Sequence, residues 1–234
     1  MYTWTMSWQE RKHEFLRDQQ ILEPLRQYTA SRLRKIVRKV RHFPFCHIQH
    51  VTAPTNNRYL WIFMFLNPED SRNFRYELLS FALIQSEKGI FVFTSFEGAL
   101  HGSGAVMLIP HFFSRYAERT GQSFTSPLCC IETFLTRNIY IMVRKRTNSF
   151  SEEMEISSYE VCAPSQEGVC LGLCDPYECN NILLKTFVTY DMLRTNQMPD
   201  VAECLSSMNQ ASTNKRSNSM SEKQAFISFL AFEN

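Results

Sequence analysis

One histidine and two arginines recur at four-residue steps in the middle of the chain, at His111, Arg115 and Arg119. Because successive helical residues turn by about 100°, a helix here would carry all three side chains on one face. An imidazole exchanges protons near neutral pH, and guanidinium groups bind phosphate oxygens. The spacing therefore predicts a phosphate-directed face with acid–base chemistry centred on His111.

The residues around this row favour a helix with an apolar back. Pro110 suits the first helical turn, where its missing N–H costs nothing. The opposite side of the helix is expected to carry three aromatic residues, Phe112, Phe113 and Tyr116. The alternative is an ordinary surface helix in which Arg115 pairs with Glu118, three residues further on.

A second group of polar residues lies near the end of a predicted strand over residues 181–189. Simple alternation puts Lys185 and Thr189 on one face and Thr186 on the other. Lys185 and Thr189 would then face either the histidine helix or the solvent. An ordinary strand sequence is the alternative, since threonine favours strands in any case.

The N-terminal part of the chain is expected to be helical over residues 8–43. Pro24 is predicted to divide it into two helices, because an internal proline costs about 3 kcal/mol. The apolar residues that recur at roughly helical spacing are Leu16, Ile21, Leu25, Tyr28, Leu33, Ile36, Val37 and Val40.

Basic residues concentrate in the second of these helices. From Pro24 to Pro68 the chain has eight Lys or Arg residues and no Asp or Glu, although its formal net charge is only +2. Such a block favours an anionic partner, nucleic acid or acidic lipid, while a solvated helix face is the alternative. The residues that we expect to bind RNA or DNA are Arg32, Arg34, Lys35, Arg38, Lys39 and Arg41.

The remaining pattern predicts an α+β fold, with N-terminal helices and antiparallel sheets packed against helices. A helix is expected over residues 127–143. Strands are expected over residues 59–66, 76–85 and 89–96, which would form a three-stranded sheet, and over residues 156–163, 168–174 and 181–189, with a loop or short strand at 105–109.

Three regions are predicted along the chain. Residues 1–50 form a basic helical region, residues 51–200 the α+β core, and residues 201–234 a polar, mobile tail. The apolar segment from Phe226 to Phe232 is compatible with a docking segment, a partner-binding motif or a frayed end.

The composition of the chain also indicates where the protein is located and whether it binds a metal or a cofactor. The first twenty residues lack the order of a signal peptide, so we expect a cytoplasmic protein. The longest apolar run, at residues 59–66, is far shorter than the roughly 20 residues that cross a bilayer, so no membrane association is expected. Cys162, Cys170, Cys174 and Cys179 lack the paired spacing of zinc sites. We therefore expect reduced cysteines, no metal and no cofactor.

The His-x-x-x-Arg-x-x-x-Arg helix, a further helix and a meander ending in a Lys-Thr strand together resemble a superfamily of nucleases and toxins. It joins barnase, EndoU-like nucleases, colicin ribonucleases and RelE-type toxins, and the resemblance covers residues of about 105–195. It implies an antiparallel sheet packed on helices and RNA cleavage without metal. His111 would act as acid or base, while Arg115, Arg119 and Lys185 hold phosphate and Thr186 or Thr189 donates hydrogen bonds.

Whether the chain is an enzyme stays open at this point. The same architecture without catalysis would make a nucleic-acid- or protein-binding module. Such a module would use the basic helix and the His111 face as its contact surface.

Overall fold

The computed structural model describes residues 1–3, 5–98, 102–138, 144–145, 159–175, 181–193 and 201–202. The chain divides into two compact units, Met1–Ser95 and Phe96–Asn234. The boundary falls at neither residue 50 nor residue 200, where the sequence analysis divides the chain. Helices and sheet strands occur in both units, which confirms the α+β class. The segment from Phe226 to Phe232 lies outside the described residues.

The first unit is built on one long helix, α1, which spans Trp8–Val37. A reciprocal capping box starts it: Ser7 Oγ accepts a hydrogen bond from the Glu10 amide, and the Glu10 carboxylate accepts one from the Ser7 amide. Among the described helices, none has the length and apolar character needed to cross a membrane.

The prediction that Pro24 divides this segment into two helices is wrong, because α1 continues through it. The missing hydrogen bond is offset by packing on both sides of the proline. Phe15 and Leu22 are buried before it, and Leu33 and Val37 are buried after it. Burial of each such side chain is worth about 1.5–3 kcal/mol, which together exceeds the cost of one internal proline.

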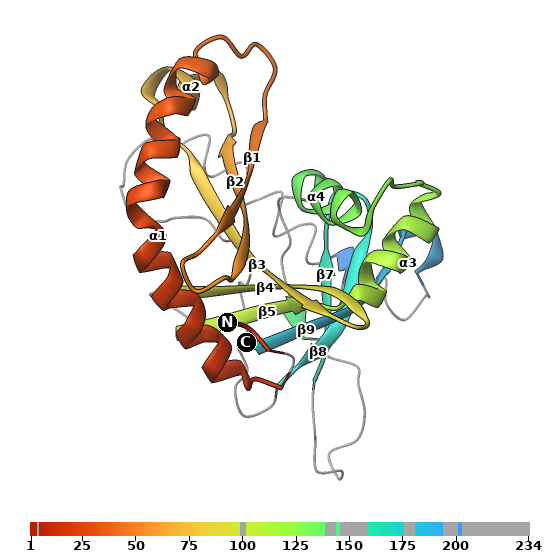
Figure 1. Ribbon diagram of the computed structural model, residues 1–234. Helices are drawn as coiled ribbons and strands as arrows, with labels where there is room; N and C mark the ends of the chain where they lie inside the picture. Colours follow the sequence, from red (N-terminus) through yellow and green to blue (C-terminus); the bar gives the residue numbers. More distant parts are fainter. Residues whose placement is uncertain are drawn as a thin grey trace. The chain divides into compact units, whose positions relative to one another are not determined.

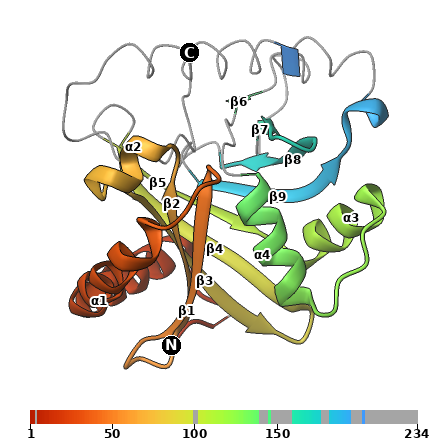
Figure 2. The same cartoon turned by 90° about the horizontal axis from the view of Figure 1, so that it is seen from above.

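Four strands form the sheet of this unit, in the order β1-β2-β3-β4 with antiparallel neighbours. Their bounds are Phe45–Thr52, Arg58–Phe65, Glu77–Ser86 and Gly89–Gly98. The sequence analysis predicted three of these strands and missed β1. Polar and apolar residues are mixed along β1, so it lacks the alternation that identifies a strand. Figures 1 and 2 show α1 lying along this sheet, and the Phe15 ring contacts the rings of Tyr59 and Phe93.

A short helix that the sequence analysis missed, α2 (Pro68–Asn73), follows β2. Asn67 caps it by accepting a hydrogen bond from the Asp70 amide, and Pro68 occupies the first turn. Ser71 Oγ donates to the Val37 carbonyl at 2.9 Å, which ties α2 to the C-terminal end of α1.

Polar groups lie beneath the N-terminal half of α1. Asp18 is fully buried, and its Oδ2 accepts hydrogen bonds from Asn57 Nδ2, Tyr59 Oη and Thr55 Oγ1 at 2.6–2.8 Å. Asn57 also donates to Glu14, one helical turn before Asp18. This end of the helix is thus held by hydrogen bonds to carboxylates, which are stronger than neutral ones.

The second unit contains strands β5 (Gly102–Leu108), β6 (Arg144–Lys145), β7 (Tyr159–Pro164), β8 (Val169–Cys174) and β9 (Asn181–Val188), in the order β5-β9-β8-β7-β6. The antiparallel meander that the sequence predicted is confirmed for β7, β8 and β9. The β5–β9 pair is parallel, which was not predicted. Parallel neighbours need a long crossover connection, and helices α3 (Pro110–Thr120) and α4 (Pro127–Arg137) lie between these two strands in the sequence.

Aromatic rings form the core between the helices and β9. Helix α4 ends at Arg137, whereas the sequence analysis predicted a helix up to Val143. Residues 139–143 lie outside the described part. The Phe134 ring of α4 contacts those of Phe112 and Tyr116 at centroid distances of 4.9 and 5.1 Å. A short 3-10 turn, Tyr190–Met192, follows β9.

Candidate functional site

Helix α3 has one apolar side and one polar side, as predicted. Phe112, Phe113 and Tyr116 are buried, whereas His111 is exposed. Pro110 occupies the first turn, and the N-cap residue Ile109 offers no side-chain acceptor to the amides there. The apolar back and the polar front expected from the spacing are therefore confirmed.

The exposed front of α3 holds a row of three contacting side chains. Arg115 Nε donates to His111 Nε2 at 3.3 Å, and Arg115 Nη1 donates to the Glu118 carboxylate at 2.6 Å. Nε2 is therefore the acceptor atom of the ring in this contact. A guanidinium has five N–H donors, and these two contacts use two of them. The Arg115–Glu118 pair of the alternative interpretation is thus present, together with a contact to His111.

Arg119 lies one turn further along and contacts β9. Its Nη1 donates to the Phe187 carbonyl oxygen and lies 3.4 Å from Thr186 Oγ1. The contact fixes the C-terminal end of α3 on the strand. The phosphate-binding role of Arg119 stays a prediction, because in the structure its guanidinium is hydrogen-bonded to β9.

Lys185 occupies a bulge in β9. Leu171 of β8 pairs with Thr186, but the next residue, Gly172, pairs with Leu184, so Lys185 is the extra residue. A bulge breaks the alternation of side chains, and the simple assignment of Lys185 and Thr186 to opposite faces does not apply across it. Lys185 is exposed, beside the Thr186 that contacts Arg119.

Two glycines permit the close approach of β8 to β9. A Cβ atom on Gly172 would lie 2.1 Å from the Leu183 carbonyl oxygen, and one on Gly168 would lie 2.3 Å from that of Val188. Any other residue at Gly172 would push the bulged segment away. The glycine therefore helps to set the position of Lys185 and Thr186 relative to α3.

A carboxylate that the sequence analysis did not assign, Glu167, joins α3, α4 and the β7–β8 turn. It accepts hydrogen bonds from Tyr116 Oη at 2.5 Å, Asn138 Nδ2 at 3.1 Å and Arg137 Nη1 at 3.2 Å. Its own amide donates to Asn138 Oδ1. Glu167 lies between the strands predicted over residues 156–163 and 168–174, and no spacing in the sequence relates it to Tyr116, 51 residues away.

This network changes the acidity of Tyr116. Burial, and then the hydrogen bond to Glu167, raise the pKa of the Tyr116 phenol above its ordinary value of 10.0. Burial also raises the pKa of the Cys130 thiol to about 11. Both groups therefore stay protonated at neutral pH and serve packing and hydrogen bonding.

The six predicted nucleic-acid-binding residues lie in the first unit, in the last turns of α1 and directly after it, and all are exposed. The Arg32 guanidinium lies 5.8 Å from the centre of the Tyr28 ring, and that of Arg34 lies 5.3 Å from the centre of the Phe74 ring. The structure thus divides the basic block between two sides of α1.

No group of three or more His, Cys, Asp or Glu side chains placed to hold a metal ion occurs in the described part of the chain. The six described cysteines carry free thiols. Comparison of the chain with protein-family models, curated proteins and solved structures yields no match.

Proposed function

We propose that the exposed front of α3 binds an RNA phosphodiester and promotes its cleavage without a metal ion. The observation that carries the proposal is the contact between His111 Nε2 and Arg115 Nε on a solvent-exposed helix face. It places a proton acceptor beside a phosphate-binding cation. The resemblance of residues 105–195 to the ribonuclease and toxin superfamily supports the same chemistry.

The reaction uses the ribose 2′-hydroxyl as nucleophile. His111 Nε2 takes the proton of this hydroxyl, whose oxygen attacks the adjacent phosphorus. Arg115 transfers its hydrogen bond from the imidazole to a phosphate oxygen and stabilises the charge that develops there. The 5′-oxygen leaves and takes a proton from solvent, which yields a 2′,3′-cyclic phosphate and a 5′-hydroxyl.

Residues around the row have supporting roles in this proposal. Glu118 holds the Arg115 guanidinium from the side opposite His111. Lys185, exposed at the bulge, supplies a second cation, and Thr186 supplies a hydroxyl that Arg119 contacts. The network around Glu167 positions α3 through Tyr116.

Cleavage of a labelled RNA in the presence of a chelator tests the proposal. We expect cuts that leave 5′-hydroxyl ends, and no cuts in DNA of the same sequence. His111→Ala should abolish activity, and Arg115→Ala should slow it by about 10²-fold, or about 2.7 kcal/mol. A matched control is Arg26→Ala, because Arg26 forms an i,i+3 pair with Glu23 on α1.

RNA that stays intact over a wide pH range would refute the proposal, as would a His111→Ala variant that cuts as well as the parent. In either case the binding module becomes the better account of the same surface. Equal loss of activity in the Arg26 control would show that removal of any exposed arginine has the same effect.

A further inference from the structure

Helix α1 exposes several large apolar side chains to solvent. Exposed large apolar side chains of this helix are Leu16, Ile21, Leu25, Tyr28 and Ile36. Tyr28 is the most exposed of them, at 59%. Soluble proteins seldom gather such side chains on one element unless that surface contacts a partner.

Four of these residues form one row with a cation inside it. Ile21, Leu25, Tyr28, Arg32 and Ile36 fall within about 80° around the helix axis, and we call this row the outer stripe. Arg32 stands between Tyr28 and Ile36, with its guanidinium over the Tyr28 ring. Lys35 projects beside the stripe, and Lys39 follows the helix end.

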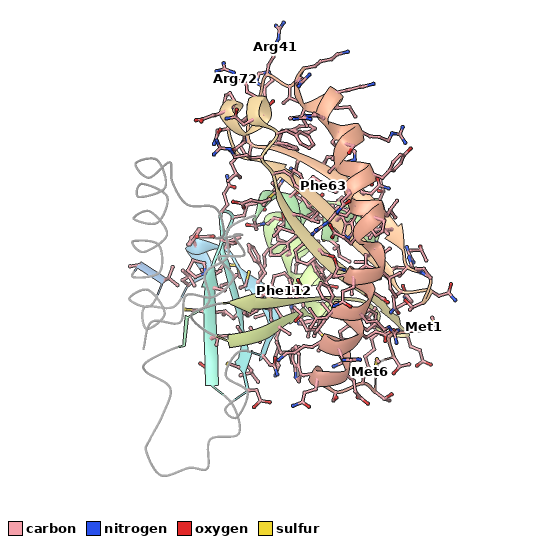
Figure 3. All side chains as sticks on the ribbon, turned by 90° about the vertical axis from the view of Figure 1, so that its left-hand side faces the viewer. Met1, Met6, Arg41, Phe63, Arg72 and Phe112 are labelled. Atoms are coloured by element: carbon pink, nitrogen blue, oxygen red, sulfur yellow. The ribbon has the colours of Figure 1, made fainter. Side chains whose placement is uncertain are left out.

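More positive charge gathers at the same end of the first unit. Figure 3 shows Arg41 and Arg72 both at this end of the first unit, although they are 31 residues apart in the sequence. Arg72 belongs to α2, which the Ser71–Val37 hydrogen bond holds against α1. The absence of Asp and Glu between Pro24 and Pro68 leaves α1 without acidic residues over its last fourteen positions.

Apolar, aromatic and basic side chains on one surface favour one class of ligand. A lipid surface or a partner helix would favour an unbroken apolar row, and Arg32 interrupts it. A duplex presents phosphates but hides the faces of its bases. Single-stranded nucleic acid offers both phosphates and open base faces, which stack on aromatic rings beside cations.

We propose that the outer stripe binds single-stranded nucleic acid, with a base stacked on Tyr28 and phosphates on Arg32, Lys35 and Lys39. This surface belongs to the first unit and contains none of the residues of α3. The proposal therefore stands independently of the proposed cleavage.

Binding to a fluorescent oligothymidylate of about 20 nucleotides tests the inference, with the full chain and anisotropy as the readout. A deoxyribonucleotide lacks the 2′-hydroxyl nucleophile, so failure to bind is distinct from failure to cleave. We expect Tyr28→Ala to weaken binding about tenfold, because stacking on one aromatic ring carries that magnitude. Tyr28→Phe keeps a ring and should bind within about twofold of the parent.

Leu16→Ala is the matched control, since Leu16 is an exposed apolar residue of α1 that lies outside the outer stripe and cannot stack with a base. It should leave the affinity within about twofold. Replacement of both Lys35 and Lys39 by Gln should lower the slope of log affinity against log salt by about 1.4, or about 0.7 for each lost phosphate contact.

Three results would overturn the inference: parent-like affinity in Tyr28→Ala, equal affinity for a duplex of the same length, or an equal loss in the Leu16 control. Vesicles rich in anionic lipid provide a fourth comparison. Tyr28-dependent binding to these vesicles without binding to the oligonucleotide would assign the stripe to a membrane surface instead.

Discussion

Removal of the Tyr116 hydroxyl offers a direct test of the network that positions α3. In Tyr116→Phe the ring contacts with Phe134 and Phe187, at centroid distances of 5.1 Å, are retained. Only the hydrogen bond to the Glu167 carboxylate is lost. Glu167 keeps its contacts with Asn138 and Arg137, so the loss is that of one hydrogen bond to a charged group.

Such a hydrogen bond contributes about 2 kcal/mol, and we expect that decrease in the free energy of unfolding of the second unit. For a chain of this size the melting temperature should fall by about 6 °C. All three tryptophans lie within residues 1–95, so tryptophan fluorescence follows the first unit. Amide hydrogen exchange in α3 and β9, measured by mass spectrometry, follows the second.

The effect should depend on pH in one direction. Because the folded state raises the pKa of Tyr116, the neutral phenol is favoured there. The stabilisation is complete below about pH 10, the ordinary value for tyrosine, and is lost as the pH rises through the higher pKa of the folded state. The difference between parent and Tyr116→Phe should therefore shrink above about pH 10.

Tyr28→Phe is the control, because the Tyr28 side chain is exposed and its hydroxyl should contribute less than about 0.5 kcal/mol to stability. A loss in Tyr116→Phe no larger than in this control would refute the reasoning. So would faster exchange confined to the first unit, since Tyr116 and Glu167 both belong to the second.

Two further changes probe other parts of the fold. Gly172→Ala should destabilise the second unit by more than about 2 kcal/mol, because its Cβ would collide with the Leu183 carbonyl oxygen. Hydrogen exchange of the β9 amides should then be faster than in the parent. Exchange at the parent rate would show that the bulge relaxes without cost in stability. Asn57→Ala should cost about 3 kcal/mol in urea unfolding followed by tryptophan fluorescence, because Asp18 and Glu14 each lose a donor while buried. A midpoint unchanged in that variant would mean that water replaces the amide.

Local pattern was sufficient for α3 and the final meander. The aromatic residues at positions 112, 113 and 116 predicted the buried side of α3, and Pro110 predicted its start. Neighbouring side chains on one helix meet through the helical repeat alone, so the contacts of Arg115 with His111 and with Glu118 follow from spacing. The third member of the predicted row, Arg119, contacts β9 instead.

The N-terminal helix shows where periodicity fails. Apolar spacing predicted helix over residues 8–43, and α1 occupies Trp8–Val37 of this range, so the predicted C-terminal bound is six residues too far. The spacing also misidentified the buried side, because Ile21, Leu25, Tyr28 and Ile36 are exposed. The buried side of the first turns carries Glu14 and Asp18 instead, because Asn57 and Tyr59 approach from the sheet. A helical repeat defines faces, and only the partner that packs on the helix decides which face is buried.

By itself, the sequence determined the elements whose cause is local: the α3 helix, the β7–β9 meander and the charge of the block after Pro24. Tertiary structure alone decided the contacts between distant segments. Examples are the convergence of Tyr116, Asn138 and Glu167, the Arg119–Thr186 contact and the bulge at Lys185. These depend on strand register and on which element covers which face, and no repeat along the chain encodes either property.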